Sequence, residues 1–432
     1  MQENLRHFMQ RGYKSRGINS LDFVSYDDLA ELQYAYRNKE EALVINRVDG
    51  FEYSFATNIV ANRTVLANLL NTEVDDIHPK MLSYMQNLIS PKLVASGPCQ
   101  EMRLIGHDVD LANLPAIQFN EEDAGRYLTA GIVFAKDRRN PSFQNASVHR
   151  VQLQGKNQLG IRLEKGHLLA LQQEAEKAGQ DLEVAIAIGT HPAEMVASVS
   201  GLDYGVSEMA LAGAIRGEAL EMVHALTVDV DVPTTADIII EGVIPAYKRE
   251  LEGPFGDFQG YYVNPAQNHI VIVNAVTHTK DKPIFTSIRA GSHEDSLLLG
   301  LKNEVKIYEA LMGKHKVTGV NLSPMVFNCI ISIEKQNDAE PHEIIENAFS
   351  QYPWLKYCVV VDEDVDCYNM EDVWWAIGTR SNPSTGSSFI KSDASYNKDP
   401  YHIHSGKLGI DATVPCQYKH FFRRAKPKKS VY

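Results

Sequence analysis

The apolar run Val184-Ala185-Ile186-Ala187-Ile188-Gly189 decides the fold class of this chain. It has the composition of a strand inside a core, and its length suits a strand better than a helix. Three other segments share either this apolar character or the alternation of a half-buried strand: residues 151–153, 237–243 and 269–273. Helices are expected near 165–178 and 206–214. The middle of the chain is therefore predicted to be a β-barrel or sandwich with helical insertions.

The segments on either side of this β-rich middle have the pattern of α/β domains. Before it, a helix is expected behind Ser25, a strand over 42–48 and a helix over 81–89. The turn-forming Gly97-Pro98-Cys99-Gln100 marks a boundary. After the middle, the expected elements are a helix over 297–312, a helix from residue 339, a strand over 358–361 and a helix that carries Trp374 and Trp375.

At 432 residues the chain is too long for one ordinary core, so several domains are expected. We predict a mixed α+β fold in which a central β-rich domain is flanked by α/β domains. The expected boundaries are 1–95, 96–288 and 289–415, followed by a basic C-terminal tail over 416–432. No G-x-G-x-x-G or Walker loop occurs, which disfavours a Rossmann or P-loop nucleotide site.

Composition excludes several classes of function. The formal net charge of −13 argues against a nucleic-acid partner, because phosphate binding needs a basic face. No run of 18 apolar residues occurs and the first residues lack the apolar core of a secretory signal, so neither membrane insertion nor secretion is expected. The five cysteines never form a C-x-x-C pair, which suits a reducing cytoplasm and gives no thiolate metal site.

Glu252-Gly253-Pro254-Phe255-Gly256-Asp257 sets two acids five residues apart around a turn. Pro fixes one backbone dihedral and Gly admits positive φ, so this segment is predicted to be a shaped loop. Two carboxyl groups on such a loop favour a division of labour, in which one donates a proton while the other stays charged. A solvated acidic turn is the alternative.

Three polar segments of the middle region offer metal ligands. In Gln144-Asn145-Ala146-Ser147-Val148-His149-Arg150, an extended backbone would point Asn145, Ser147 and His149 to one side and Arg150 to the other. His167 and Glu208 each stand at an expected helix start, where a capping or dipole role is the simpler explanation. Together, Asn145, His167 and Glu208 form a mixed O/N set that suits Mn²⁺ or Mg²⁺ better than a structural zinc.

Several motifs, in this order along the chain, resemble those of the UbiD-type decarboxylases, which use prenylated FMN. They are Asn145-x-Ser147-x-x-Arg150, His167, Ser207-Glu208, the segment 251–257, the acidic loop 361–366, Trp375-Ala376-Ile377-Gly378-Thr379-Arg380 and the segment 407–413. The similarity runs from about residue 95 to 415. It implies that the central region is a split β-barrel that binds the flavin.

The resemblance also implies roles for individual residues. Asn145, His167 and Glu208 would hold Mn²⁺ at the cofactor phosphate, and Ser147 and Arg150 would contact the flavin. Potassium would bind carbonyl groups at Ala146, Ala197, Ser198 and Ser200. The catalytic acid–arginine–acid set would be Glu252, Arg150 and Asp257, with Asp where Glu is commoner in the family. Alkenyl-acid members carry a Lys where Ser350 stands, so Lys335 is the substitute candidate.

A small aromatic acid is the substrate that the resemblance implies, with CO₂ as the other product. His293 stands where aromatic-acid members carry a His, and the apolar Leu301 stands where a second substrate carboxylate would need a cation. We therefore expect reversible, non-oxidative decarboxylation of a (hydroxy)aromatic or heteroaromatic monocarboxylic acid. The alternatives are a cinnamate-type acid decarboxylase and a non-catalytic flavin- or metal-binding subunit. A flavin prenyltransferase would supply the cofactor, and a homo-oligomer (dimer or hexamer) is expected.

Overall fold

The structure is a computed structural model that describes residues 2–12, 17–385, 387–390 and 406–425. Residues 426–432 of the predicted basic tail lie outside these ranges. The chain divides into two compact units, Met1–Leu299 and Gly300–Tyr432. In the described ranges, no helix combines the length and the apolar character needed to cross a bilayer.

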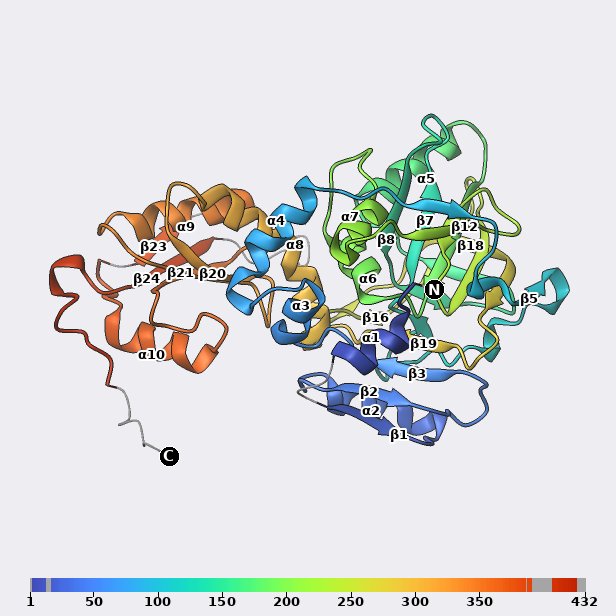
Figure 1. Ribbon diagram of the computed structural model, residues 1–432, viewed down its shortest axis with the longest axis horizontal. Coiled ribbons are helices and arrows are strands. Elements are labelled where there is room, and N and C mark those ends of the chain that lie inside the picture. Colours follow the sequence, from blue (N-terminus) through green and yellow to red (C-terminus); the bar gives the residue numbers. More distant parts are fainter. Residues whose placement is uncertain (1, 13–16, 386, 391–405, 426–432) are drawn as a thin grey trace. The chain divides into compact units, whose positions relative to one another are not determined.

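Ten α-helices occur in the described residues (Figure 1). They are α1 (Leu5–Gly12), α2 (Leu29–Tyr36), α3 (Arg63–Leu69), α4 (Ile77–Gln86), α5 (His167–Lys177), α6 (Pro192–Val199), α7 (Glu208–Arg216), α8 (His293–Leu311), α9 (Glu340–Gln351) and α10 (Met370–Arg380).

A ten-stranded antiparallel sheet forms the middle of the first unit. Its main path runs β6-β9-β10-β18-β14-β11-β7-β8, and β15 and β5 also pair with β18. The strands are β5 (Met102–Ile105), β6 (Tyr127–Leu128), β7 (Ile132–Lys136), β8 (Gln144–Val148), β9 (Val151–Leu153), β10 (Gln158–Ile161), β11 (Leu182–Ile188), β14 (Ile238–Ile244), β15 (Arg249–Glu252) and β18 (Ala266–His278). The pairings among described residues do not close this path into a ring.

The predicted core strands are confirmed, and their register explains their composition. Ile186 of β11 lies opposite Val133 of β7 on one side and Ile240 of β14 on the other. All three side chains are buried in one hydrophobic core. A strand with neighbours on both sides and no solvent-facing edge reads as a continuous apolar run, which is how β11 appears in the sequence.

Helices α5, α6 and α7 pack against β8, and Figure 1 shows them beside this strand. The predictions near 165–178 and 206–214 are confirmed by α5 and α7. Helix α6 was not predicted, although its start carries a recognisable signal. Pro192 occupies the first turn, and the His191 side chain accepts a hydrogen bond from the Ala193 N–H as an N-cap.

Smaller sheets complete the first unit. A four-stranded sheet has the order β1 (Ile18–Leu21), β2 (Ala42–Ile45), β3 (Ser54–Thr57) and β19 (Ile284–Ser287). The others are β13 (Asp231–Pro233)-β12 (Glu221–His224)-β4 (Lys92–Val94) and the pair β16 (Phe255–Gly256) and β17 (Tyr262–Val263). Buried residues of the four-stranded sheet, such as Ile45 and Phe55, belong to the same core as β11.

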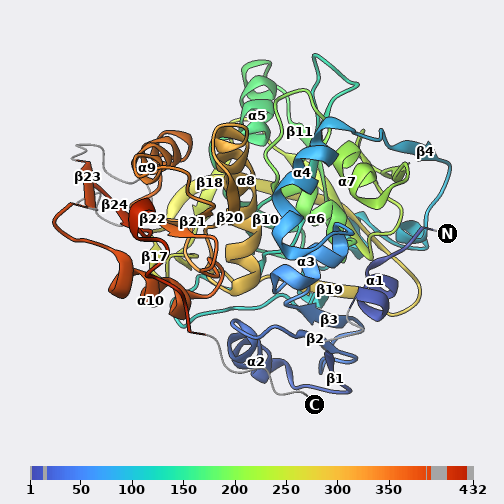
Figure 2. The ribbon, with the colours of Figure 1, turned by 60° about the vertical axis from the view of Figure 1, so that its left-hand side comes forward.

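The second unit is a five-stranded sheet between two helices. Its order is β20 (Val317–Asn321), β21 (Asn328–Ile333), β22 (Tyr357–Asp362), β24 (Lys407–Ala412) and β23 (Ser387–Ile390). Figures 1 and 2 show α9 on one face and α10 on the other. Val359 and Val361 of β22 pack with Val373 and Ala376 of α10. On the other face, Gly409 of β24 lets α9 pack closely against the sheet, since a Cβ at this position would lie 2.4 Å from the Ile345 side chain.

Candidate active site

Arg150, Glu252 and Asp257 meet in the first unit, although they are up to 107 residues apart. Arg150 follows β8, Glu252 ends β15, and Asp257 follows β16. The Arg150 Nε and Nη2 atoms donate to Glu252 Oε1 and Oε2 at 3.1 and 3.2 Å, which is a bidentate pair. Arg150 Nη1 donates to Asp257 Oδ2 at 3.5 Å. Glu252 is 1% exposed, so its charge is taken out of water in the presence of its partner.

The loop between the two acids is shaped as the sequence predicts. Gly253 has a φ of 90°, a backbone conformation that side-chain-bearing residues rarely adopt. Phe255 is buried and lies under the guanidinium, with the Arg150 Cζ atom 4.7 Å from the ring centroid. The loop is therefore a preformed support for Arg150 rather than a solvated turn.

Asp123 clamps this loop from a neighbouring turn and was not predicted. Its carboxylate accepts hydrogen bonds from the N–H groups of Phe119, Asn120 and Gly256, the last at 2.7 Å. A side chain at Gly256 would collide with Asn120, since a Cβ would lie 2.4 Å from its Nδ2 atom. Asp123 thus fixes the backbone directly before Asp257.

Asn268 is a second partner of Glu252 that sequence reasoning missed. Its Nδ2 atom donates to Glu252 Oε2 at 2.8 Å. In the pairing of β15 with β18, Asn268 lies opposite Glu250, so Glu252 is its diagonal neighbour on the same face. Tyr127 also lies close, and burial together with the Glu252 charge raises the pKa of its hydroxyl. Only the strand register identifies these neighbours.

The three predicted metal ligands converge on β8. Asn145 is in this strand, while His167 begins α5 and Glu208 begins α7, two helices that both pack on β8. Glu208 Oε2 accepts the Ala146 N–H at 3.0 Å, and its Oε1 lies 4.0 Å from His167 Nδ1. Burial raises the pKa of Glu208 to about 7.

This donor set fits a divalent cation. A buried carboxylate beside an imidazole and an amide is costly without positive charge, and a hard cation offsets that cost. In the described residues no cluster of three or more His, Cys, Asp or Glu side chains has metal-binding geometry. The set of Asn145, His167 and Glu208 has only two such side chains, and its third member is an amide.

The alternation predicted for 145–149 is confirmed. Asn145 Nδ2 donates to Ser147 Oγ at 2.9 Å, and Ser147 Oγ lies 3.0 Å from His149 Nε2, so the three side chains share one side. Burial lowers the pKa of His149 to about 4, so it is neutral at pH 7. Near the same strand, Ser198 of α6 has a buried hydroxyl without a hydrogen-bond partner among the described residues. That orphaned oxygen fits a bound ion or a phosphate.

The predicted substrate residues lie along α8. His293 is the first residue of this helix and is half-buried. Its backbone N–H donates to the Arg37 carbonyl at 2.8 Å. Burial, and then the Arg37 charge, lower the pKa of its imidazole, which favours the neutral ring. Leu301 is 1% exposed and belongs to the apolar side of the helix.

Residues 92–293 match the family described as 3-octaprenyl-4-hydroxybenzoate carboxy-lyase Rift-related domain, and residues 296–412 match the corresponding C-terminal domain. The chain belongs to the UbiD family. The two matched regions cover most of the chain and contain the motifs that resemble this family, except for the last residue of the segment 407–413.

Individual members of the UbiD family match over nearly the whole chain. The anhydromevalonate phosphate decarboxylase of Methanothermobacter thermautotrophicus is 31% identical over 89% of this chain and 91% of the relative. The phenolic acid decarboxylase of Bacillus subtilis is 30% identical over 88% of this chain and 84% of the relative. An evolved dimeric form of the UbiD-class enzyme HmfF from Pelotomaculum thermopropionicum, solved with prFMN, has a TM-score of 0.91 at 32% identity, covering 99% and 97% of the two chains.

The C-terminal UbiD motifs meet in the second unit as a buried ion pair. Arg380 Nη1 donates to Asp362 Oδ2 at 2.8 Å and to Asp364 Oδ1 at 2.7 Å. Asp362 also accepts the Val414 N–H, directly after the segment 407–413. Lys335, the candidate phosphate ligand, is buried there and binds Thr413 Oγ1 at 2.8 Å and Asp338 Oδ1 at 2.9 Å. These contacts stabilise the second unit.

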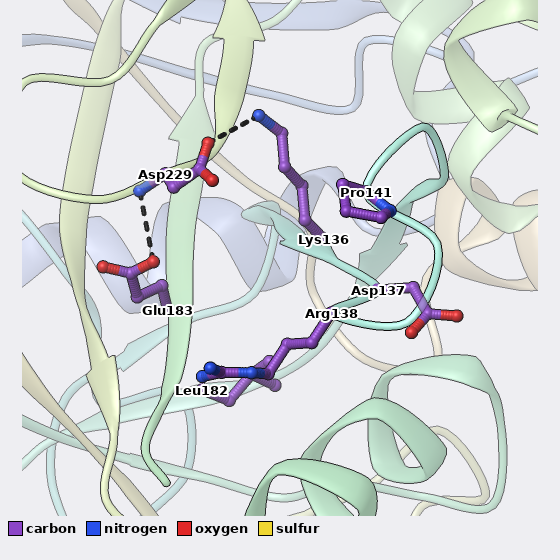
Figure 3. A pocket seen from close by; sticks show the side chains of 7 residues that line it. All are labelled: Lys136, Asp137, Arg138, Pro141, Leu182, Glu183 and Asp229. Carbon is purple, nitrogen blue, oxygen red and sulfur yellow. Dashed lines mark hydrogen bonds and ion pairs between the residues drawn. The ribbon is translucent and has the colours of Figure 1, made fainter.

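A separate polar pocket of about 240 Å³ opens on the first unit (Figure 3). It is lined by Lys136, Asp137, Arg138, Pro141, Leu182, Glu183 and Asp229. Lys136 Nζ donates to Asp229 Oδ1 at 2.8 Å across it. None of the predicted site residues of this UbiD-family chain lines the pocket, so it is not the candidate active site.

Proposed function

We propose that this protein is a prenylated-FMN-dependent carboxy-lyase that decarboxylates a (hydroxy)aromatic or heteroaromatic acid reversibly and without oxidation. The observation that carries the proposal is the placement of Arg150 between Glu252 and Asp257 on a clamped loop. A guanidinium held by two acids in a largely buried position is costly to maintain without a use. Membership of the UbiD family and the prFMN bound to HmfF support the cofactor.

Losing CO₂ from an aromatic ring leaves an electron pair on the ring carbon, and the bound cofactor supplies the electron sink for it. Arg150 orients the substrate carboxylate through charge-assisted hydrogen bonds. Glu252 accepts the Arg150 hydrogen bonds as a carboxylate in the resting site, so it first takes up a proton from solvent. When the bond between the ring and the carboxylate carbon breaks, the protonated Glu252 gives this proton to the ring carbon, forming a C–H bond. Asp257 is the hydrogen-bonding partner that helps set the protonation of this group.

We place the cofactor on the ten-stranded sheet, as one wall of a split barrel formed by the region 96–288. Asn145, His167 and Glu208 would hold Mn²⁺ or Mg²⁺ against the cofactor phosphate, and Ser147 and Arg150 would contact the flavin. Potassium would lie by α6, near the orphaned Ser198 hydroxyl.

The substrate class rests on two positions. A neutral His293 ring offers one N–H donor and one acceptor for a phenolic hydroxyl or a ring N–H. Leu301 offers no charge for a second carboxylate. The phenolic acid decarboxylase among the relatives supports an aromatic acid. We also propose that a flavin prenyltransferase matures the protein and that the chain forms a homo-oligomer, as does the evolved dimeric form of HmfF.

Two preparations of the protein, made with and without a coexpressed flavin prenyltransferase, test this function. Each is mixed with benzoate-type, hydroxybenzoate-type and five-membered heteroaromatic monocarboxylic acids, and CO₂ release is measured. We expect turnover only in the matured preparation and only with members of these classes. A preference for cinnamate-type acids or dicarboxylates would overturn the substrate assignment. Matured protein that binds the cofactor and releases no CO₂ from any acid would overturn the enzymatic function.

A further inference from the structure

His149 directly follows β8 and is neither a predicted metal ligand nor a member of the acid–arginine–acid set. Its imidazole connects two parts of the sheet. The Nδ1 atom lies 3.3 Å from the carbonyl oxygen of Arg162, the residue after β10, and the Nε2 atom lies 3.0 Å from Ser147 Oγ. Ser147 Oγ is in turn 2.9 Å from Asn145 Nδ2. Three hydrogen bonds in series therefore join the Arg162 carbonyl to the amide of a predicted metal ligand.

The Arg162 carbonyl determines the direction of every bond in this series. A carbonyl oxygen can only accept, so His149 carries a proton on Nδ1. Burial keeps the ring neutral at pH 7, which leaves Nε2 as an acceptor. The Ser147 hydroxyl then donates to Nε2, and its oxygen accepts the N–H of Asn145 Nδ2. Each contact has one donor and one acceptor.

The opposite orientation of the Asn145 amide is incompatible with this series. With Oδ1 toward Ser147, the hydroxyl would donate to the amide, and His149 Nε2–H would have to donate to the hydroxyl. The lone pair of Nδ1 would then face the Arg162 carbonyl, so two acceptors would lie 3.3 Å apart without a proton between them. The amide therefore turns its Nδ2 atom toward Ser147, and Oδ1, on the opposite side of the amide carbon, points away from it.

This orientation matters because Oδ1 is the atom of an asparagine that binds a divalent cation. Asn145 is 2% exposed, so protein partners rather than solvent set its orientation. The next residue, Ala146, donates its N–H to Glu208 Oε2, which places the amide close to a second predicted ligand.

We propose that His149 is a positioning residue that presents Asn145 Oδ1, rather than its NH₂ group, to the divalent cation by acting through the Ser147 hydroxyl. His149 itself binds neither the cation nor the substrate. The inference rests on the metal site of the proposed function.

The first test is the affinity of the unmatured protein for Mn²⁺ alone, measured by titration calorimetry. His149→Phe keeps a flat ring and removes both nitrogen atoms. Its affinity should fall by about 10-fold or more, since changes next to metal ligands cost 10- to 100-fold. His149→Gln has one donor and one acceptor group and should recover part of this loss. The matched control is His269→Phe, another buried imidazole of the same sheet whose pKa burial lowers to about 4. It should bind Mn²⁺ as the wild type does.

Ser147→Ala interrupts the same series at its middle and distinguishes positioning from a general structural role. If His149 acts through Ser147, the double variant Ser147→Ala/His149→Phe should bind Mn²⁺ no more weakly than Ser147→Ala alone. Additive losses would overturn the inference, as would wild-type affinity in His149→Phe. A wild-type protein that does not bind Mn²⁺ would overturn the metal site and this inference together.

The second test needs neither metal nor cofactor. Nitrogen NMR of the histidine rings in the unmatured protein distinguishes protonated from unprotonated ring nitrogens, and the signals that His149→Phe removes belong to His149. We expect the His149 proton on Nδ1, and a proton on Nε2 alone would overturn the inference. Neither test involves turnover, so failure of this inference is distinguishable from failure of the proposed decarboxylation, which CO₂ release measures.

Discussion

Arg150 and Glu252 are 102 residues apart and join two different strand ends by a pair of parallel hydrogen bonds of 3.1 and 3.2 Å. The contact is largely shielded from water, since the two side chains are 12% and 1% exposed. In this geometry the guanidinium has one edge fixed by Glu252 and its Nη1 atom near Asp257. A substrate carboxylate would therefore meet a cation whose orientation is already set.

Replacing Arg150 by Lys tests the need for this planar, bidentate contact. Lys keeps the charge and loses the fork that matches a carboxylate. We expect kcat/KM to fall by about 10²-fold or more, with the protein still folded. Arg249→Lys is the matched control, because Arg249 also pairs with a carboxylate outside the cluster, where its Nη2 atom alone donates to both oxygens of Glu176. Equal losses in the two variants would contradict a special role for Arg150.

The parts of this site that are local in sequence were predictable, and the parts that depend on register were not. Gly253 and Pro254 indicate a shaped loop, and the alternation from Asn145 to His149 places three side chains on one side. Asn268 and Asp123 carry no local signal. They reach the loop only because β15 pairs with β18 in one register and because the 119–124 turn folds onto Gly256.

The same distinction applies to the fold. Strand β11 was predicted because both its faces and both its edges are covered, which leaves a continuous apolar run. Helix α6 was missed because its eight residues are too few to show helical periodicity, and its N-cap is a His rather than a common capping residue. Sequence also predicted a barrel or sandwich, but closure depends on strand pairings that no single segment determines.

Metal binding is tested through His167, which begins α5 beside Glu208. We expect His167→Ala to weaken Mn²⁺ binding to the unmatured protein by at least about 10²-fold, since even outer-shell changes at metal sites cost 10- to 100-fold. Titration calorimetry with Mn²⁺ alone measures this. His224→Ala provides a surface-histidine control. Unchanged Mn²⁺ affinity in His167→Ala would remove His167 from the ligand set.

A buried ion pair ties α6 to α7 and gives a stability prediction. Arg216 Nη1 donates to Glu194 Oε1 at 2.8 Å, and the two side chains are 3% and 0% exposed. Arg216→Met would leave Glu194 buried without its cation, so the free energy of unfolding should fall by about 3–5 kcal/mol. Urea denaturation measures the change. The double variant Arg216→Met/Glu194→Leu should recover much of it, and a single variant as stable as the wild type would contradict this account.

Asp237 makes stability depend on pH. Its pKa is about 7 in the folded chain because of burial, against 3.8 for an ordinary Asp. Below pH 4 the carboxyl is protonated in both states. As pH rises from 4 to 7 only the unfolded state releases its proton, so the free energy of unfolding falls by a few kcal/mol, on the order of 1.4 per pH unit.

Asp237→Asn cannot ionise and keeps an oxygen for the Ile284 N–H. We expect its melting temperature to match the wild type near pH 4 and to exceed it at pH 8. A variant that is less stable than the wild type at pH 8 would show that the carboxylate is stabilising, against the burial argument.

The most direct measurement of the central claim is turnover of a matured Glu252→Gln variant in D₂O. The wild type should place one deuterium on the ring carbon that carried the carboxylate. Glu252→Gln should bind the flavin, as seen in its absorbance, and lose about 10²- to 10⁴-fold in kcat, while Glu250→Gln on the same strand should behave as the wild type. A Glu252→Gln variant that retains wild-type turnover and deuterium incorporation would contradict the account.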